Sequence, residues 1–148
     1  MIKYSHLFTL IFIGLISLSF SKKNEIYSLT VTVNSLRNSD GVVLFLLYNE
    51  DGTIPDKDRS KYYKKFSSSI ASNKATITFD SLPQGKYAIN IIHDENSNGK
   101  IDMGFLLPKE GIGFSNFKKL NIFNRPNFSK ASFKLDTDIS INIKTIYM

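Results

Sequence analysis

Oxygen-bearing side chains recur at every second position in the segment HDENSNGKID, residues 93–102. An aspartate and two asparagines occupy the first, third and fifth positions of a loop, and Gly99 follows at the sixth. Calcium takes roughly six to eight oxygen ligands at flexible angles, and glycine permits the sharp bend that wraps a chain around such an ion. The pattern therefore predicts a calcium site. Its predicted ligands are Asp94, Asn96, Asn98, Lys100 (through its carbonyl oxygen) and Asp102.

The loop departs from an EF-hand at its twelfth position, where Phe105 replaces the bidentate glutamate. The segment before it is also patterned as a strand rather than a helix. Glu110 is the nearest downstream residue that could supply a missing carboxylate, and the side chain of Glu95 should point away from the ion. Few of the ligands are charged, so we expect a dissociation constant of about 10⁻⁴ to 10⁻³ M. The alternative is a plain hairpin turn at NSNG, residues 96–99, because Asn-Gly is a strong turn signal.

His93 and Glu95 flank Asp94, and a histidine beside carboxylates is a pattern for acid–base catalysis. Adjacent residues on a strand face opposite ways, so His93 and Asp94 converge only if the strand ends between them. His6 is the other histidine and the chain has no cysteine, which argues against a multi-imidazole zinc or copper site. We therefore expect a non-enzymatic protein with no catalytic residues. A hydrolase that acts on envelope material through His93, Asp94 or Glu95 is the alternative.

The first 21 residues have the layout of a secretory signal. Lys3 gives a positive start, an uncharged apolar run covers residues 7–20, and small residues precede a predicted cleavage after Ser21. The run is shorter than the roughly 20 residues of a membrane-spanning helix. We expect export to the periplasm or the cell exterior, with membrane attachment only if this segment is retained. Without cysteines, an exported domain must be stabilised by its core or by a metal.

The formal charge of +6 becomes +5 when Lys3 is removed with the signal, and KDRSKYYKK (residues 57–65) carries much of it. A solvated basic face is the main expectation, with contact to anionic polymers or lipid head groups as the alternative. The chain lacks a nucleic-acid recognition motif, so we expect no nucleic-acid partner. Only the segment 56–65 is patterned for a helical turn or two.

Residues 22–148 are enough for one domain with a hydrophobic core. Apolar residues alternate with polar ones in several short segments, and Asn, Asp, Pro and Gly mark turns between them. Strands are predicted at 27–33, 41–49, 74–80, 86–93, 131–136 and 138–146, with a weaker candidate at 65–71. The segment 41–49 is apolar throughout, which predicts a strand buried on both faces. Together these segments predict an all-β protein, a single antiparallel β-sandwich of about seven strands, immunoglobulin-like in architecture.

The segment 106–128 is long for a connection in a compact domain and too apolar for a linker. We expect its aromatic and aliphatic residues to cap one end of the sandwich, because most apolar residues are buried. An aromatic surface for a sugar or peptide is the alternative. Gly111 and Gly113 should let the chain fold back tightly against the loop at 94–102.

The chain resembles the bacterial DUF2141 family of exported proteins. Segments 29–49, 79–116 and 131–148 carry the resemblance, above all His93 to Asp102 followed by PKEGIGFSN. The resemblance implies a small β-sandwich similar to prealbumin-like domains, secreted or periplasmic, with no assigned activity. We therefore expect an exported module whose calcium-bound loop shapes one end of the sandwich for an envelope partner or a glycan. A purely structural envelope protein without a metal is the remaining alternative.

Overall fold

The computed structural model describes residues 25–56, 58–105, 108–121 and 123–148. The predicted secretory signal, residues 1–21, lies outside the described residues. Within the described part, no helix is long and apolar enough to cross a membrane. The N-terminal strand begins at Ile26, one residue before the alternating pattern that starts at Tyr27.

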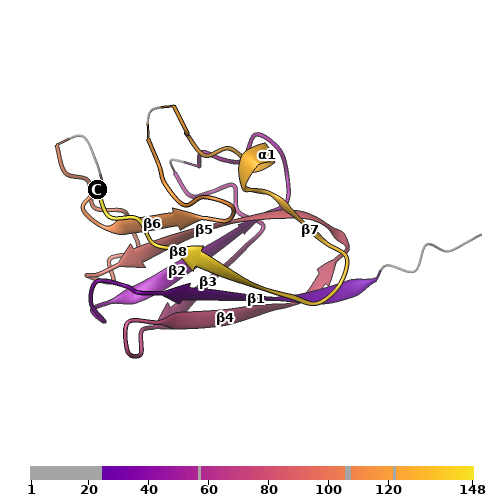
Figure 1. Ribbon diagram of the computed structural model, residues 1–148, viewed down its shortest axis with the longest axis horizontal. Helices are drawn as coiled ribbons and strands as arrows, with labels where there is room; N and C mark the ends of the chain where they lie inside the picture. Colours follow the sequence, from indigo (N-terminus) through magenta and orange to yellow (C-terminus); the bar gives the residue numbers. More distant parts are fainter. Residues whose placement is uncertain (1–24, 57, 106–107, 122) are drawn as a thin grey trace, which may run out of the picture.

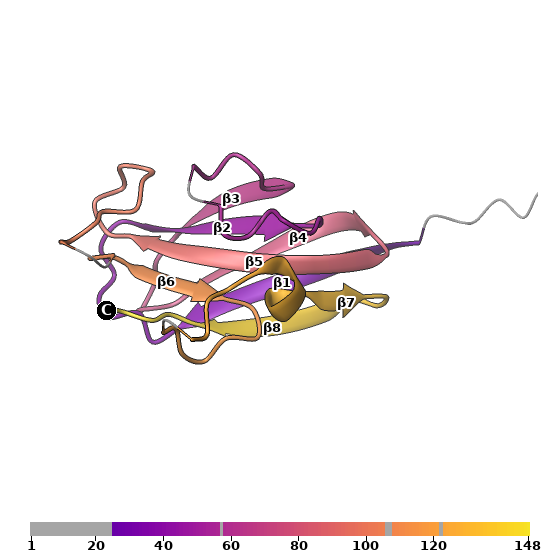
Figure 2. The same cartoon turned by 90° about the horizontal axis from the view of Figure 1, so that it is seen from above.

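Two β-sheets pack face to face, with loops and a one-turn helix, α1 (Phe128–Ala131), above the larger sheet (Figure 1). The smaller sheet has the order β4-β1-β8, with β1 at Ile26–Asn34, β4 at Ala75–Pro83 and β8 at Ile139–Lys144. The larger sheet has the order β3-β2-β5-β6, with β3 at Lys64–Ser69, β2 at Val42–Tyr48, β5 at Gly85–Asp94 and β6 at Gly111–Phe114. A fifth strand of this sheet, β7 (Phe133–Leu135), pairs with the beginning of β5, as Figure 2 shows from above.

The prediction of a purely antiparallel sandwich is wrong at one pair of strands. β1 and β8 run parallel, with Leu29 opposite Ile139 and Asn34 opposite Lys144. The period-2 pattern of a strand indicates which face is buried, but it does not indicate the direction of the strand. The all-β class and the two-sheet arrangement are confirmed, with eight strands rather than about seven. The additional strand, β6, lies inside the segment 106–128 that was read as a connection.

β2 and β5 are buried on both faces because each contributes to two hydrophobic clusters. Phe45 and Ile91 lie between the sheets, whereas Leu46 and Ile92 lie on the outer face of the larger sheet. The prediction that residues 41–49 form a doubly buried strand is therefore confirmed. The outer cluster is covered mainly by side chains from loops and α1. This cover explains how the larger sheet can have an apolar outer face without a third layer of helices or strands.

The segment 106–128 covers this outer face rather than an end of the sandwich, so its predicted place was wrong. Phe117 and Phe128 are buried there against β2 and β5. Phe123 does not join them and is 88 % exposed. The error arose because apolar content indicates that a segment is buried but not which surface it buries. The basic segment 56–65 is also irregular up to Tyr63 in its described part, where the sequence allowed a helical turn.

The C-terminal residues lie against β6 because this strand carries no side chain at Gly111 and Gly113. Ile112 and Ile146 exchange backbone hydrogen bonds of 3.0 and 2.7 Å. A Cβ atom at Gly111 would lie 2.4 Å from the methyl group of Thr145, which is closer than such contacts allow. Gly111 also pairs with His93 of β5. The glycines thus bring both the C-terminus and residues 108–110 close to the start of the 94–102 loop.

Candidate functional site

Asp94 organises the 94–102 loop, which leaves the end of β5. Asp94 is the first residue of a solvent-facing loop, yet it is only 1 % exposed. Its Oδ1 accepts a hydrogen bond from the N–H of Asn98 (3.0 Å), and its Oδ2 accepts one from the N–H of Gly99 (2.7 Å). Such charge-assisted bonds are about twice as strong as neutral ones. Asp94 therefore draws the backbone into a tight turn, which Gly99 completes with a φ of +73°.

The other predicted ligands converge on the same loop. Asn96 Oδ1 accepts from the N–H of Asn98 (3.0 Å), and Asn98 Oδ1 accepts from the N–H of Lys100 (2.7 Å). The Nδ2 groups of Asn96 and Asn98 donate to the two carboxylate oxygens of Asp102, at 2.7 and 3.1 Å. Ile101 is half-buried against the outer core and fixes the loop from below. The side chains of Asn96 and Asn98 therefore face Asp102 across the loop, whereas the Asp94 carboxylate contacts the loop backbone.

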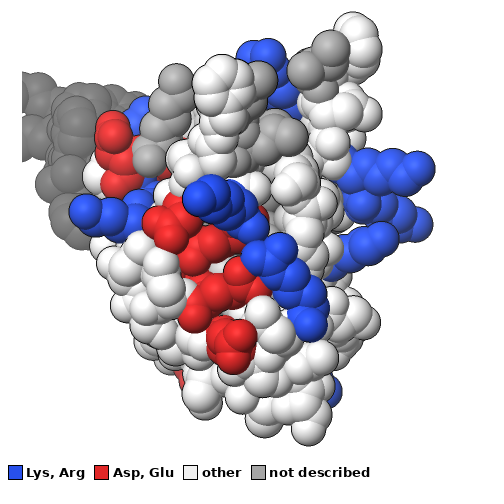
Figure 3. Space-filling model, turned by 90° about the vertical axis from the view of Figure 1, so that its left-hand side faces the viewer, with Lys and Arg blue, Asp and Glu red and all other residues white. Residues whose placement is uncertain are grey.

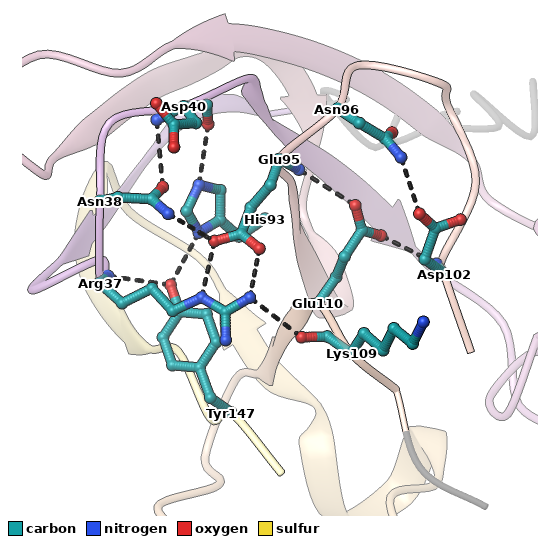
Figure 4. A network of polar contacts seen from close by, with 10 residues as sticks. All are labelled: Arg37, Asn38, Asp40, His93, Glu95, Asn96, Asp102, Lys109, Glu110 and Tyr147. Atoms are coloured by element: carbon teal, nitrogen blue, oxygen red, sulfur yellow. Dashed lines mark hydrogen bonds and ion pairs between the residues drawn. The ribbon is translucent and has the colours of Figure 1, made fainter. Parts of the chain in front are cut away.

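Glu110 supports the loop from underneath. It is 3 % exposed, and its two oxygens accept hydrogen bonds from the N–H of Glu95 (3.1 Å) and of Asp102 (2.9 Å). One carboxylate thus joins the first and last parts of the loop (Figure 4). The sequence suggested Glu110 as the source of the carboxylate that Phe105 does not supply; the structure places it at the loop, where both of its oxygens accept from backbone N–H groups. Phe105 itself is 99 % exposed and makes no contribution to this network.

Glu95 points away from the loop interior, as expected. Its carboxylate pairs with the guanidinium of Arg37 through Nε (2.7 Å to Oε1) and Nη2, and it also accepts from Asn38 Nδ2 (2.8 Å). Arg37 further donates to the carbonyl oxygen of Lys109 (3.1 Å). These contacts attach the segment after β1 to both sides of the loop. On this side of the molecule, acidic side chains on the surface are bordered by basic ones (Figure 3).

His93 lies behind this ion pair and is fully buried. The Tyr147 hydroxyl accepts from the backbone N–H of Arg37 (3.1 Å) and lies 2.7 Å from His93 Nδ1, to which it donates when the neutral ring carries its proton on Nε2. His93 Nε2 donates to the carbonyl oxygen of Asp40 (3.0 Å), which fixes the tautomer (Figure 4). Burial raises the pKa of Tyr147, which keeps its phenol protonated for this role. Both ring nitrogens of His93 are therefore occupied by structural partners.

The ion pair at Glu95 leads to a pH dependence of stability. The Arg37 guanidinium beside Glu95, together with Asn38, holds the pKa of the Glu95 carboxyl below its ordinary value. A carboxyl whose pKa is lower in the folded than in the unfolded protein stabilises the fold above the unfolded pKa. That contribution is lost as the pH falls through the folded pKa. We expect Glu95→Gln to be destabilising near roughly pH 7 and less destabilising at acid pH, measured as free energies of unfolding in urea. An equal effect at both pH values would contradict this assignment.

The basic segment contributes one contact to the loop, because Arg59 Nη1 donates to the carbonyl oxygen of Gly99 (3.0 Å). The sequence did not single out Arg59, Arg37 or Tyr147 as parts of the site. Each comes from a segment far from residue 94, and no local spacing marks them. The place of Arg37 in the sequence could have indicated its role. It comes soon after β1, and the end of β1 must lie near the loop if the two sheets share that end of the sandwich.

The loop offers two carboxylates, Asp94 and Asp102, beside neighbouring amide and carbonyl oxygens, and the carboxylate oxygens accept hydrogen bonds from within the loop. Within the described residues, no three or more His, Cys, Asp or Glu side chains are grouped so that they could hold a metal ion. His93 and Glu95 approach to 3.9 Å, so they do lie on one side, whereas Asp94 turns to the other. This proximity does not make a catalytic pair, because the imidazole is sealed from solvent and fully hydrogen-bonded.

A family model described as an uncharacterized protein conserved in bacteria (DUF2141) matches residues 31–142 of the chain. The match includes most of the fold and the whole 94–102 loop. No curated protein and no solved structure shows significant similarity to the chain.

Proposed function

The chain belongs to the DUF2141 family, and we propose that it is an exported, non-enzymatic binding module whose 94–102 loop is stabilised by calcium. The observation that carries this proposal is the convergence of the Asp94, Asn96, Asn98 and Asp102 side chains on one loop. In this arrangement the amide groups of Asn96 and Asn98 are the hydrogen-bond donors to Asp102. A cation would replace them as the partner of that carboxylate, while the amide oxygens became ligands.

The surrounding contacts support calcium rather than magnesium. Calcium accepts irregular sets of oxygen ligands at about 2.3–2.6 Å, whereas magnesium requires near-octahedral geometry and keeps several waters. The loop offers two carboxylates and several neutral oxygens, held by Glu110 and by backbone N–H groups rather than by a rigid cage. Its low charge accounts for the weak affinity that we expect, about 10⁻⁴ to 10⁻³ M. A purely structural loop without metal is the main alternative.

The loop also carries a surface for a partner. Met103 and Phe105 follow it directly and are 59 % and 99 % exposed, respectively. Exposed large apolar side chains beside an ordered polar loop are typical of contact sites. We propose that the ion fixes the loop and so presents these two side chains to an envelope protein or a glycan. The hydrolase alternative lacks support at His93, Asp94 and Glu95, because each is engaged in the contacts that hold the loop.

The place of action and the finer fold class are part of the proposal. The uncharged apolar run at residues 7–20 supports export to the periplasm or the cell exterior through a signal that is removed. Two facing sheets of three and five strands support a relationship to prealbumin-like and immunoglobulin-like sandwiches.

We expect calcium to raise the thermal stability of the protein after removal of metals with EDTA. At about 10 mM calcium and a dissociation constant near 10⁻³ M, a site that binds only the folded state adds about 1.4 kcal/mol. For a protein of this size, that corresponds to a rise of about 3–5 °C in the melting temperature. Differential scanning calorimetry with and without calcium would measure it, and magnesium at the same concentration should give little effect.

Two variants with the same change of charge sharpen this test. Asp102→Asn removes a ligand carboxylate and should abolish the calcium-dependent rise. Asp51→Asn removes an exposed carboxylate from the turn that follows β2. This turn is at the end of β2 far from the 94–102 loop, so the variant should leave the rise unchanged. If both variants keep the full rise, calcium does not act through the loop. If neither they nor the wild type respond, the loop is a structural turn.

A further inference from the structure

A second surface, distinct from the 94–102 loop, forms an open groove beside β8. One half of the groove, about 690 Å³ in volume, lies between the Phe114–Lys118 segment and β8. Phe114, Phe117, Phe133 and Ile141 give this half an apolar lining. Its walls are fixed, because Ser115 Oγ donates to the carbonyl of Ala131 (2.6 Å) and accepts from the N–H of Ile89 (2.9 Å). The apolar half is therefore built into the packing between β6, α1 and β7.

The groove continues into a basic half of about 440 Å³ between residues 118–121 and the C-terminal residues 144–148. Lys118 and Lys144 line both halves, and Lys119 lines the basic half. All three lysines are exposed, and none of them forms an ion pair within the described residues. Basic side chains are also visible to the right of the acidic cluster in Figure 3, on the side of the molecule where β8 lies. The groove thus has apolar side chains at one end, and lysines where its halves meet and in the other half.

Thr145 provides an independent sign that the basic half receives a polar group. The residue lines this half and is only 6 % exposed, yet its Oγ1 has no hydrogen-bond partner among the described residues. Its methyl group lies against Gly111, whose missing side chain makes room for it. A buried hydroxyl without a partner is unfavourable, and such groups in native proteins are rare. A ligand oxygen that reached this buried hydroxyl, once the side chains that cover it moved aside, would satisfy it.

We propose that this groove binds a fatty-acid-like carboxylate, with its alkyl chain in the apolar half and its carboxylate in the basic half. Each half of the groove, about 690 and 440 Å³, falls within the range of about 300–1,000 Å³ that is typical of small-molecule sites. The aromatic and aliphatic walls match an alkyl chain, and the lysines and Thr145 match an anionic head group. This site is separate from the 94–102 loop and does not depend on calcium.

The proposal can be tested with four probes that separate the head group from the chain. Decanoate should bind the full-length protein in isothermal titration calorimetry at concentrations below micelle formation. Decyltrimethylammonium and decyl maltoside have the same chain with a cationic or neutral head, and they should bind at least about tenfold more weakly. Acetate has the head group alone and should give no measurable binding. Equal binding of the three decyl compounds would overturn the proposal, because it would show nonspecific adsorption of the chain.

Variants on the protein side locate the site. Lys118→Gln with Lys144→Gln should weaken decanoate binding about tenfold and leave decyl maltoside unaffected. Lys65→Gln with Lys74→Gln makes the same change of charge at exposed positions outside the groove and should have no effect. Thr145→Val keeps the shape of the residue and should weaken decanoate binding several-fold without lowering the melting temperature of the free protein. Unchanged decanoate affinity in both the lysine pair and Thr145→Val would contradict the assigned site.

Discussion

Gly41→Ala is expected to destabilise the protein by about 4 kcal/mol or more, which is a large share of the stability of a typical domain, about 5–15 kcal/mol. Gly41 precedes β2 and lies against the end of β5 where the 94–102 loop begins. A Cβ atom there would lie 2.0 Å from the carbonyl oxygen of Asp94 and 2.7 Å from the Cα of Glu95. Both obstacles are backbone, so relief would require β2 and β5 to separate. The φ of Gly41, +67°, adds a further cost for any residue with a side chain.

Gly52→Ala is the matched control, because it separates the cost of the backbone angle from that of the clash. Gly52 has a φ of +75° and lies in the turn after β2, where a Cβ atom would meet nothing within 4 Å. Gly52→Ala should therefore lower the free energy of unfolding by only about 1–2 kcal/mol. Urea unfolding of both variants would measure the difference. If Gly41→Ala is no less stable than Gly52→Ala, residue 41 does not lie as close to the loop as described. A Gly41→Ala protein that is insoluble or unfolded would agree with the close approach.

Glu110→Ala is expected to lower the free energy of unfolding by about 3 kcal/mol, because two charge-assisted hydrogen bonds are lost and two N–H groups are left without partners. Those N–H groups belong to Glu95 and Asp102, at the two ends of the loop. The amide hydrogens of the loop should also exchange faster with solvent, since Glu110 is the contact that joins both ends. Urea unfolding and hydrogen exchange measured by NMR would report the two effects.

Two further variants define the origin of this effect. Glu110→Gln keeps the shape and one acceptor oxygen, but its NH₂ group faces an N–H donor, so we expect a loss of about half that of Glu110→Ala. Glu50→Ala removes an exposed glutamate elsewhere and should change stability by about 0.5 kcal/mol or less. A Glu110→Ala protein as stable as Glu50→Ala would show that the buried carboxylate does not support the loop.

The sequence predicted the parts of this fold that depend on local pattern. The alternation in β1 and the continuous apolar run of β2 follow from which faces each strand buries, and both are confirmed. It did not predict that β8 pairs with β1 in parallel, since strand direction depends on the path of the whole chain. The short strand β6 was missed because two of its four residues, Gly111 and Gly113, lack side chains and break the alternating pattern.

The candidate site shows the same division. The spacing of Asp94, Asn96 and Asn98 identified the loop, and the reach of Glu110 to it was suggested from chain proximity alone. Arg37 and Tyr147 could not be found in this way, because they reach His93 and Glu95 across more than fifty residues of sequence. Only the meeting of β1, β5 and the C-terminal segment at one end of the sandwich brings them together.

The most direct test of the calcium proposal is a titration of the ¹⁵N-labelled protein followed by two-dimensional NMR. The N–H groups of Asn98 and Gly99 donate to Asp94, so their resonances report directly on that carboxylate. We predict that these resonances and that of Lys100 move progressively with calcium at about 1–10 mM and barely respond to magnesium. If they stay fixed while other resonances move, the loop does not bind calcium and serves as a hydrogen-bonded turn. If magnesium moves them equally, the predicted preference for calcium is wrong.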